Sequence, residues 1–450
     1  MNTRTRLISA SGPAQLINVL AVLNYQLENE EKENWEDHLI LGWFCTEHSD
    51  KVTKKMIDIC TKIANAWNFK SIKYLNNQDL SSSFSFPELV ERVRTRIGLN
   101  DVSKLYLCRN WQVFNEVILE AYKHAIKICY GDGYGFLDLG DGEGRWRQKS
   151  INPKGYLKLD RAYLFIPVEA DRNGKSFSLI DITQPPIDYL TSTIENVSSL
   201  ITDLEIYTKF LLSKAESRKL TLITTSNLSE SEFMRSKSND KVYGLLDWLR
   251  FSLQQLVLGL KGKKVTSLKR RFLLLNNKFF EFAIDGFSEI LEFLIKVISV
   301  RQLRSRVNQE VSMYIDQIRR CCDKCEFIVI KSHPREIGGQ ALQLSNLLSQ
   351  EGYNVSLIDD IFSCFPVELF FKYLRFSKVV SLFSSSSLTA KLILDVEDSS
   401  LFPFINSDIT EKYVNEFHIP MLHECEPLYL DLLKQIKLRQ ILPLRLIDYK

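Results

Sequence analysis

Three short polar segments of this chain carry residue types that could do chemistry. They are the glycine-rich segment Tyr130–Gly135, which holds Asp132, the basic segment Lys331–Glu336, which holds His333, and the hydroxyl-rich segment Ser384–Thr389. A carboxylate can take a proton from an attacking hydroxyl, and an imidazole can donate a proton or a hydrogen bond to a phosphate oxygen. Serine hydroxyls and free backbone amides at a helix start can bind a phosphate. We therefore predict one site that handles a phosphate and a proton.

Each polar segment directly follows an apolar run that predicts a buried strand. These runs cover residues 125–129, 327–330 and 379–383. In open α/β sheets, ligands bind at the carboxyl ends of the strands. We therefore expect the three segments to meet in the folded protein, although they lie far apart in the sequence.

Each segment also has a simpler interpretation without chemistry. Asp132 could cap a glycine turn, His333 could be a surface residue in a loop before a helix, and the serines could only cap a helix. A rival acidic segment, Gly140–Gly144, lies close to the first one. We favour Asp132 because an apolar strand immediately precedes it.

Size and composition predict a globular protein of two domains. The chain has 450 residues, too many for one ordinary core, with 45% apolar and 25% charged residues. A net charge of +3 predicts no bulk affinity for nucleic acid. Nine scattered cysteines, no recognisable signal peptide and no uncharged apolar window of about 18 residues favour a cytoplasmic location. No second Cys/His pair accompanies the cluster Cys321, Cys322 and Cys325 at zinc-site spacing, so we expect no metal.

Apolar periodicity predicts two successive halves in which strands alternate with helices. Strands are expected at 6–10, 38–44, 104–107, 126–130, 162–168, 220–225, 327–330, 355–358 and 379–383. Helices are expected at 16–27, 52–67, 111–126, 188–217, 338–350, 366–376 and 388–394. This alternation predicts parallel sheets with helices on both faces. The fold class is therefore α/β of the GT-B type, in which two Rossmann-like domains face a central cleft.

The domain boundaries follow from the same pattern. We predict a first domain over 1–200, a second over 201–425 and a C-terminal helix over 426–450 that could pack back on the first domain. A helical insertion over 240–318 interrupts the second domain and is basic and aromatic around Lys261–Leu294. The insertion could pack on its own core. Alternatively, residues 255–306 could make peripheral contact with a membrane at its inner face.

The motifs, in this order, resemble those of a known family. An acidic motif, a His-Pro motif and a Ser-Ser/Thr motif would be Gly131-Asp132-Gly133, His333-Pro334 and Ser384–Ser387. The segments 9–18 and 222–230 are also similar to the openings of that family's two halves. The chain thus resembles the bacterial sialyltransferases of the α-2,8-polysialyltransferase-like group. The resemblance implies an inverting enzyme without metal or cofactor, a CMP-sugar donor, and a glycan or glycolipid acceptor.

The resemblance also divides the predicted site between the two domains. Asp132 would be the general base and His333 would act at the leaving phosphate. Donor-binding residues would be Lys331, Pro334, Arg335, Ser385, Ser386, Ser387 and Thr225 of the second domain. Acceptor-side residues would be Gly12, Gln15, Asn18, Gly131 and Gly133 of the first domain. Gly131 stands where the family motif has its first acidic residue, which leaves Asp132 as the single carboxylate.

Three functions are compatible with this pattern. The favoured one is transfer of sialic acid, or a related keto-sugar acid, from its CMP donor to a glycan hydroxyl. The second keeps the fold and changes the donor, for example to CMP-Kdo or a nucleotide-diphosphate sugar. The third is a catalytically silent GT-B module that binds glycan, and the glycine at position 131 favours it slightly.

Overall fold

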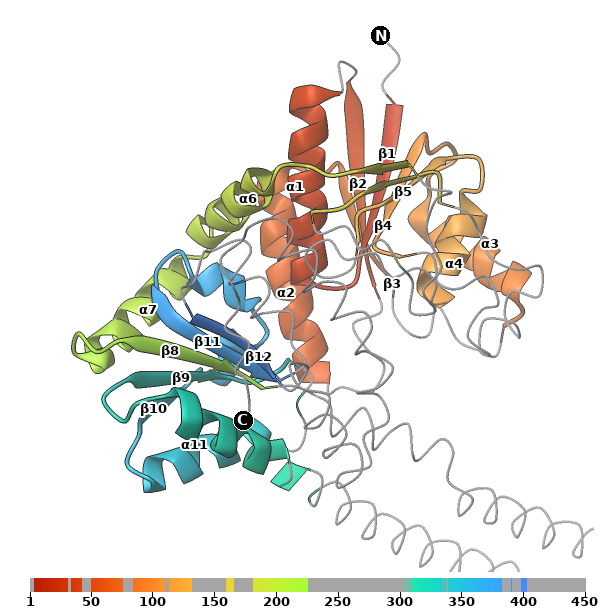
Figure 1. Ribbon diagram of the computed structural model, residues 1–450. Coiled ribbons are helices and arrows are strands. Elements are labelled where there is room, and N and C mark those ends of the chain that lie inside the picture. Colours follow the sequence, from red (N-terminus) through yellow and green to blue (C-terminus); the bar gives the residue numbers. More distant parts are fainter. Residues whose placement is uncertain are drawn as a thin grey trace, which may run out of the picture.

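The computed structural model describes parts of both predicted halves of the chain. The described residues are 4–30, 34–42, 50–75, 84–109, 113–131, 159–165, 181–225, 304, 307–308, 310–334, 336, 339–382, 390 and 398–402. Within them, the strands form two separate sheets (Figure 1).

The first sheet has seven strands in the order β3-β2-β1-β4-β5-β6-β7. They are β1 (Arg4–Ala10), β2 (Trp35–Gly42), β3 (Ser71–Leu75), β4 (Lys104–Leu107), β5 (Ile126–Cys129), β6 (Arg161–Tyr163) and β7 (Asp181–Thr183). Every neighbouring pair in this sheet is parallel. The strand order changes direction between β1 and β4, which makes the carboxyl ends of these strands the expected ligand-binding point.

Helices cover both faces of the first sheet because its strands alternate apolar side chains between the two faces. Ile8 of β1 packs into the core with α1 (Pro13–Asn29) and α2 (Asp50–Trp67), whereas its neighbour Leu7 packs with α3 (Phe86–Ile97) and α4 (Val113–Ala121). Figure 1 shows α1 and α2 on one face and α3 and α4 on the other.

The second sheet has five strands in the order β10-β9-β8-β11-β12, and its pairs are also parallel. They are β8 (Leu220–Thr224), β9 (Phe327–Lys331), β10 (Asn354–Leu357), β11 (Phe376–Leu382) and β12 (Asp398–Phe402). One face packs on α7 (Thr202–Ala215), and the other on α11 (Gln340–Gln350) and a helical segment over 310–321. Two parallel, helix-covered sheets confirm the predicted α/β fold of the GT-B type.

Two helices connect the halves. α6 (Ile187–Ser199) packs on α1 of the first half and on the 3-10 helix η1 (Val367–Phe370) of the second. On α7, the Tyr207 ring stacks on Phe362 of α12 (Asp360–Ser363) with ring centroids 4.2 Å apart. The Tyr373 hydroxyl donates a hydrogen bond of 3.1 Å to the Ser198 carbonyl. The two sheets are therefore joined through a continuous apolar core.

The structure corrects two predicted helices. The helix expected over 366–376 is only the turn of η1, and Phe376 already begins β11. The aromatic side chains there pack on one another, with the rings of Phe371 and Phe376 5.1 Å apart, so tertiary packing overrides the local pattern. The helix expected over 111–126 ends at Ala121, because residues 122–125 form the turn into β5.

Other predictions fall partly or wholly outside the described residues. Most of the insertion over 240–318 and all of the C-terminal helix over 426–450 are among these. The last part of the insertion is helical, and its Val311, Tyr314 and Ile318 belong to the core of the second sheet. The domain boundaries near 200 and 425 stay predictions.

A buried ion pair fixes the amino ends of β1 and β2. The Arg6 guanidinium donates to both carboxylate oxygens of Asp37 at 2.5 and 2.7 Å, and Arg6 is 2% exposed. The Trp67 indole donates to the same carboxylate at 3.3 Å. Because both charges are largely removed from water, the loss of either one leaves the other buried without its charged partner.

Replacing Arg6 by Met should lower the free energy of unfolding by about 3–5 kcal/mol, because it leaves the Asp37 carboxylate buried without its partner. The double change Arg6→Met/Asp37→Leu should recover most of this loss. Urea unfolding followed by circular dichroism measures both. Lys209→Ala is the control, because its ion pair with Glu205 is exposed and should contribute less than about 1 kcal/mol. An equal loss in both single variants would contradict the prediction.

Candidate active site

His333 follows the carboxyl end of β9 and is held there by its own backbone. The His333 amide donates to the Thr225 hydroxyl oxygen at 2.9 Å, and the His333 carbonyl accepts from the Glu336 amide at 2.9 Å. Thr225 lies just beyond β8, the strand that pairs with β9, and its amide donates to the Lys331 carbonyl at 3.0 Å. The two neighbouring strands therefore fix the position of this histidine.

The Glu336 carboxylate closes this arrangement into a ring of hydrogen bonds. One oxygen accepts from the Thr225 hydroxyl at 2.6 Å, and the other accepts from the Ala341 amide at 2.8 Å. Ala341 lies in the first turn of α11, where a carboxylate satisfies a free amide and is stabilised by the helix dipole. Through these hydrogen bonds, Glu336 links the ends of β8 and β9 to α11. The backbone of His333 is part of the same ring.

The Lys331 side chain is buried, although the sequence predicted that it would bind the donor beside His333. It is 5% exposed, and its ammonium donates to the carbonyls of Ser363 at 2.8 Å and Ser332 at 3.3 Å. Burial lowers the pKa of Lys331 to about 8, and nearby Glu368 opposes that shift. Its ammonium therefore binds backbone carbonyls of the chain, beneath the loop that carries His333.

At the first sheet, the carboxyl ends of β1 and β5 hold the predicted acceptor-side residues. Gly12 precedes α1, and Gln15 accepts a hydrogen bond of 2.8 Å from the Ser11 amide. Asn18 is fully buried, and its side-chain amide donates to the Tyr130 carbonyl at 2.6 Å. The structure therefore brings Gly12, Gln15, Asn18 and Gly131 to the same end of the sheet.

Gly131 has a backbone φ of 81°, a left-handed conformation that side chains rarely adopt. An acidic residue at this position would be strained. The glycine in place of the first acidic residue therefore fits the conformation of the chain at the end of β5. It leaves Asp132 as the first carboxylate beyond the turn.

Several predicted site residues lie outside the described residues. They are Asp132, Gly133, Arg335, Ser385, Ser386 and Ser387. Their roles, and those assigned to Lys331, Pro334, His333, Thr225 and the acceptor-side residues, stay predictions.

No role was predicted from the sequence for two acidic residues in these regions. Glu336 is the last residue of the basic segment that holds His333, so its place after a strand end was the available signal. Glu116 lies in the first turn of α4, is 6% exposed, and has a carboxylate oxygen without a hydrogen-bond partner in the described part of the chain. Burial raises the pKa of Glu116 to about 7. Nothing in its sequence context distinguished it from a solvated helix-start carboxylate.

The described ranges hold no group of three or more His, Cys, Asp or Glu side chains that could bind a metal ion. Within them, no helix combines the length and the apolar character needed to cross a membrane.

Comparison with known proteins identifies the family. A family model described as Alpha-2,8-polysialyltransferase (POLYST) matches residues 6–401. The chain belongs to this family, and it is therefore a sialyltransferase of the CMP-sialic acid-dependent class. The family implies a CMP-sugar donor and a glycan acceptor. No curated protein matches the chain.

Two solved structures resemble the chain distantly. A UDP-GlcNAc 2-epimerase from Neisseria meningitidis bound to UDP-GlcNAc has a TM-score of 0.35 and 12% identity, and the match covers 84% of this chain and 77% of that one. A UDP-N-acetylglucosamine 2-epimerase, described as putative, from Listeria monocytogenes has a TM-score of 0.31 and 9% identity, with coverage of 85% and 74%. These scores are too low to support an argument, so the fold assignment depends on the strand topology.

Replacing Thr225 by Val should release the backbone of His333, because it removes the hydroxyl that links the His333 amide to the Glu336 carboxylate. Hydrogen bonds to charged groups contribute about 1.5–3 kcal/mol, so exchange of the His333 amide with deuterium should accelerate at least about tenfold. Hydrogen exchange with mass spectrometry measures this. Thr225→Ser keeps the hydroxyl and should exchange like the wild type. Equal exchange in the valine variant would show that the ring does not hold the loop.

The lowered pKa of Lys331 predicts a pH dependence of stability. Between pH 8 and about 10.5, the unfolded chain binds more protons at this residue than the folded protein does, so stability rises with pH. Relative to a Lys331→Met variant, the wild type should gain up to about 3 kcal/mol over this interval. Urea unfolding of both proteins at several pH values gives the difference. A constant difference would mean that the buried lysine keeps its ordinary pKa.

Proposed function

We propose that the chain transfers sialic acid from CMP to a glycan hydroxyl with inversion at the anomeric carbon. The observation that carries this proposal is the fixed position of His333 at the carboxyl end of the second sheet, in a chain of the polysialyltransferase family. A histidine held by both its backbone amide and its carbonyl is suited to a role in which its imidazole must meet a phosphate in one geometry.

In the proposed reaction, Asp132 takes the proton of the acceptor hydroxyl as its oxygen attacks the anomeric carbon. The bond from that carbon to the CMP phosphate oxygen breaks, and CMP leaves with the bonding electrons. The His333 imidazole donates a hydrogen bond or a proton to the departing phosphate oxygen, since imidazole titrates near neutrality. The hydroxyls of Ser386 and Ser387 would hold the phosphate while charge develops there.

The distribution of roles follows the two sheets. The first sheet presents Gly12, Gln15 and Gly131 at its carboxyl edge, and we assign the acceptor to this side. The second sheet presents Thr225 and His333 at its own carboxyl edge, and we assign the CMP donor to that side. Backbone amides and hydroxyls at such edges are the usual phosphate ligands of α/β proteins.

Lys331 has a supporting role on the donor side. Lys331 uses its ammonium on the carbonyls of Ser332 and Ser363, so we assign it to supporting the loop rather than to direct contact with the phosphate. It still adds positive potential beneath His333 when charged, because buried charges are screened less than exposed ones.

We also propose that the protein works in the cytoplasm, a reducing compartment. The nine cysteines are scattered along the chain and do not have the spacing of a disulfide framework, which supports this proposal.

Purified protein incubated with CMP-sialic acid and a sialylated oligosaccharide should release CMP. Asp132→Ala and His333→Ala should each lower this rate at least about a hundredfold, the usual size of a lost acid–base group. Their circular dichroism should match the wild type.

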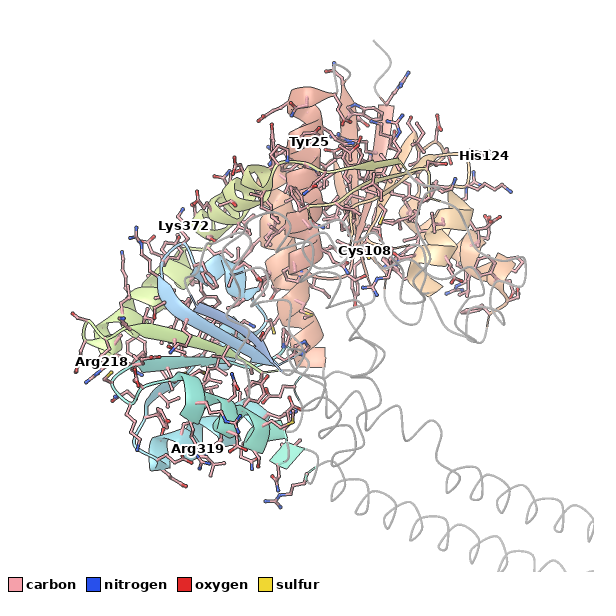
Figure 2. All side chains as sticks on the ribbon, viewed as in Figure 1. Tyr25, Cys108, His124, Arg218, Arg319 and Lys372 are labelled. Atoms are coloured by element: carbon pink, nitrogen blue, oxygen red, sulfur yellow. The ribbon has the colours of Figure 1, made fainter. Side chains whose placement is uncertain are left out.

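His124→Ala is the matched control for the His333 variant. His124 is exposed in the turn before β5, at the amino edge of the first sheet. Figure 2 shows it well away from Cys108, which follows β4 and marks the carboxyl edge. The rate of the His124→Ala variant should stay within about twofold of the wild type. A wild-type rate in either test variant would remove that residue from the mechanism. Release of sugar from CMP-Kdo alone would favour the other donor, and CMP binding without any turnover would favour the silent module.

A further inference from the structure

Asn18 is a polar residue in an otherwise apolar stretch of α1. Its neighbours Ile17 and Val19 are fully buried, and Asn18 itself is 0% exposed. Burying a side-chain amide costs free energy unless its polar atoms find partners. Asn18 uses its donor on the backbone of a distant segment, because its Nδ2 atom lies 2.6 Å from the Tyr130 carbonyl oxygen and 3.4 Å from the Gly131 carbonyl oxygen.

These two carbonyls are the last ones before Asp132. β5 ends at Cys129, so its regular pairing with β4 and β6 stops there. The Tyr130 amide still donates to the Leu107 carbonyl at 3.0 Å. Buried carbonyls need donors, and beyond the strand end the sheet no longer supplies them. Asn18 of α1 provides the donor in its place.

Tyr130 is fixed from a second direction. Its hydroxyl donates to the Ser9 carbonyl of β1 at 2.6 Å, and Tyr130 is fully buried. The residue is therefore held by β1 through its side chain, by β4 through its amide and by α1 through its carbonyl. Gly131 then turns the chain in a left-handed conformation. These contacts fix the backbone of Tyr130 and Gly131, the two residues before Asp132.

We propose that Asn18 is a positioning residue that holds the backbone before Asp132, so that this carboxylate meets the acceptor hydroxyl. The inference depends on the proposed function, because it assumes that Asp132 is the base. It gives Asn18 a role through Asp132 in place of direct contact with the acceptor. The side-chain amide donor is the essential group, since the Asn18 Oδ1 atom has no hydrogen-bond partner in the described part of the chain.

Two substitutions separate positioning from simple stabilisation. Asn18→Ala removes the donor at every pH. Asn18→Asp keeps the shape and, when ionised, turns the donor into a second acceptor that faces two carbonyl oxygens. Such surroundings disfavour the charged form and raise the pKa of the introduced carboxyl, which can donate again once it is protonated.

Asn24→Ala is the matched control on the same helix. The Asn24 side chain donates to the Thr193 hydroxyl of α6 at 3.2 Å, so its loss removes a hydrogen bond of α1 that does not reach β5. This variant should change stability slightly and leave turnover of CMP-sialic acid within about twofold of the wild type.

For Asn18→Ala we expect kcat to fall about tenfold to a hundredfold, because small displacements of a reacting group reduce rates by this amount. The KM for CMP-sialic acid should stay within about threefold, because the donor is assigned to the other domain. The ratio of the Asn18→Asp rate to the wild-type rate should rise as the pH falls from 8 to 5.5, whereas the ratio for Asn18→Ala should stay flat. If Asn18 only stabilised the fold, the two rate ratios would not differ in their dependence on pH.

Hydrogen exchange of the peptide that contains Tyr130-Gly131-Asp132 tests the contact without turnover. It should accelerate about tenfold in Asn18→Ala and remain unchanged in Asn24→Ala. Unchanged exchange and unchanged kcat in Asn18→Ala would overturn the proposal, as would equal losses of kcat in Asn18→Ala and Asn24→Ala. If the wild type releases no CMP, the proposed function fails and the catalytic part of this inference fails with it. The exchange result then decides separately whether Asn18 holds the segment.

Discussion

Parallel strand pairing is the constraint on which the rest of this structure depends. Both sheets pair in parallel throughout the described strands, so the carboxyl ends of each sheet lie along one edge. Parallel pairing requires a long connection between successive strands. Helices supply it in described connections, for example α1 between β1 and β2 and α11 between β9 and β10. The loops that leave the carboxyl edge lose the hydrogen bonds of the sheet, and the chain must satisfy their backbone groups by other means.

The carboxyl edges of the two sheets use different side chains to bind the backbone groups beyond the strand ends. At the first sheet, the neutral amide of Asn18 reaches from a helix to two carbonyls at the end of β5. At the second sheet, the charged carboxylate of Glu336 accepts from the Thr225 hydroxyl and from the start of α11. Because the Ala341 amide is already occupied, an anion at this helix start would compete with Glu336. Under the proposed function, the phosphate would therefore be bound by groups other than that amide, such as His333 and the serine segment.

The connection between the halves packs both sheets into one apolar core. α6 contacts α1 on one side and η1 on the other, and α1 is also the helix that carries Asn18. Tyr207 of α7 stacks on Phe362, and its hydroxyl accepts from the Asp359 amide at 3.0 Å. α1, whose Asn18 binds the backbone at the end of β5, is thus packed into the same core as the second sheet.

The sequence by itself determined the alternation of strands and helices, the parallel α/β class, and the order of the acidic, His-Pro and serine segments. Local periodicity reports burial directly, and short motifs directly follow the strands that present them. Only the tertiary structure decided which partners meet. Asn18 and Tyr130 are 112 residues apart, and Thr225 and Glu336 are 111 apart. The burial of Glu116 and Lys331, and the loss of the helix expected over 366–376, also came from packing. Such contacts depend on strand order and register over the whole chain, and no local pattern of residues encodes them.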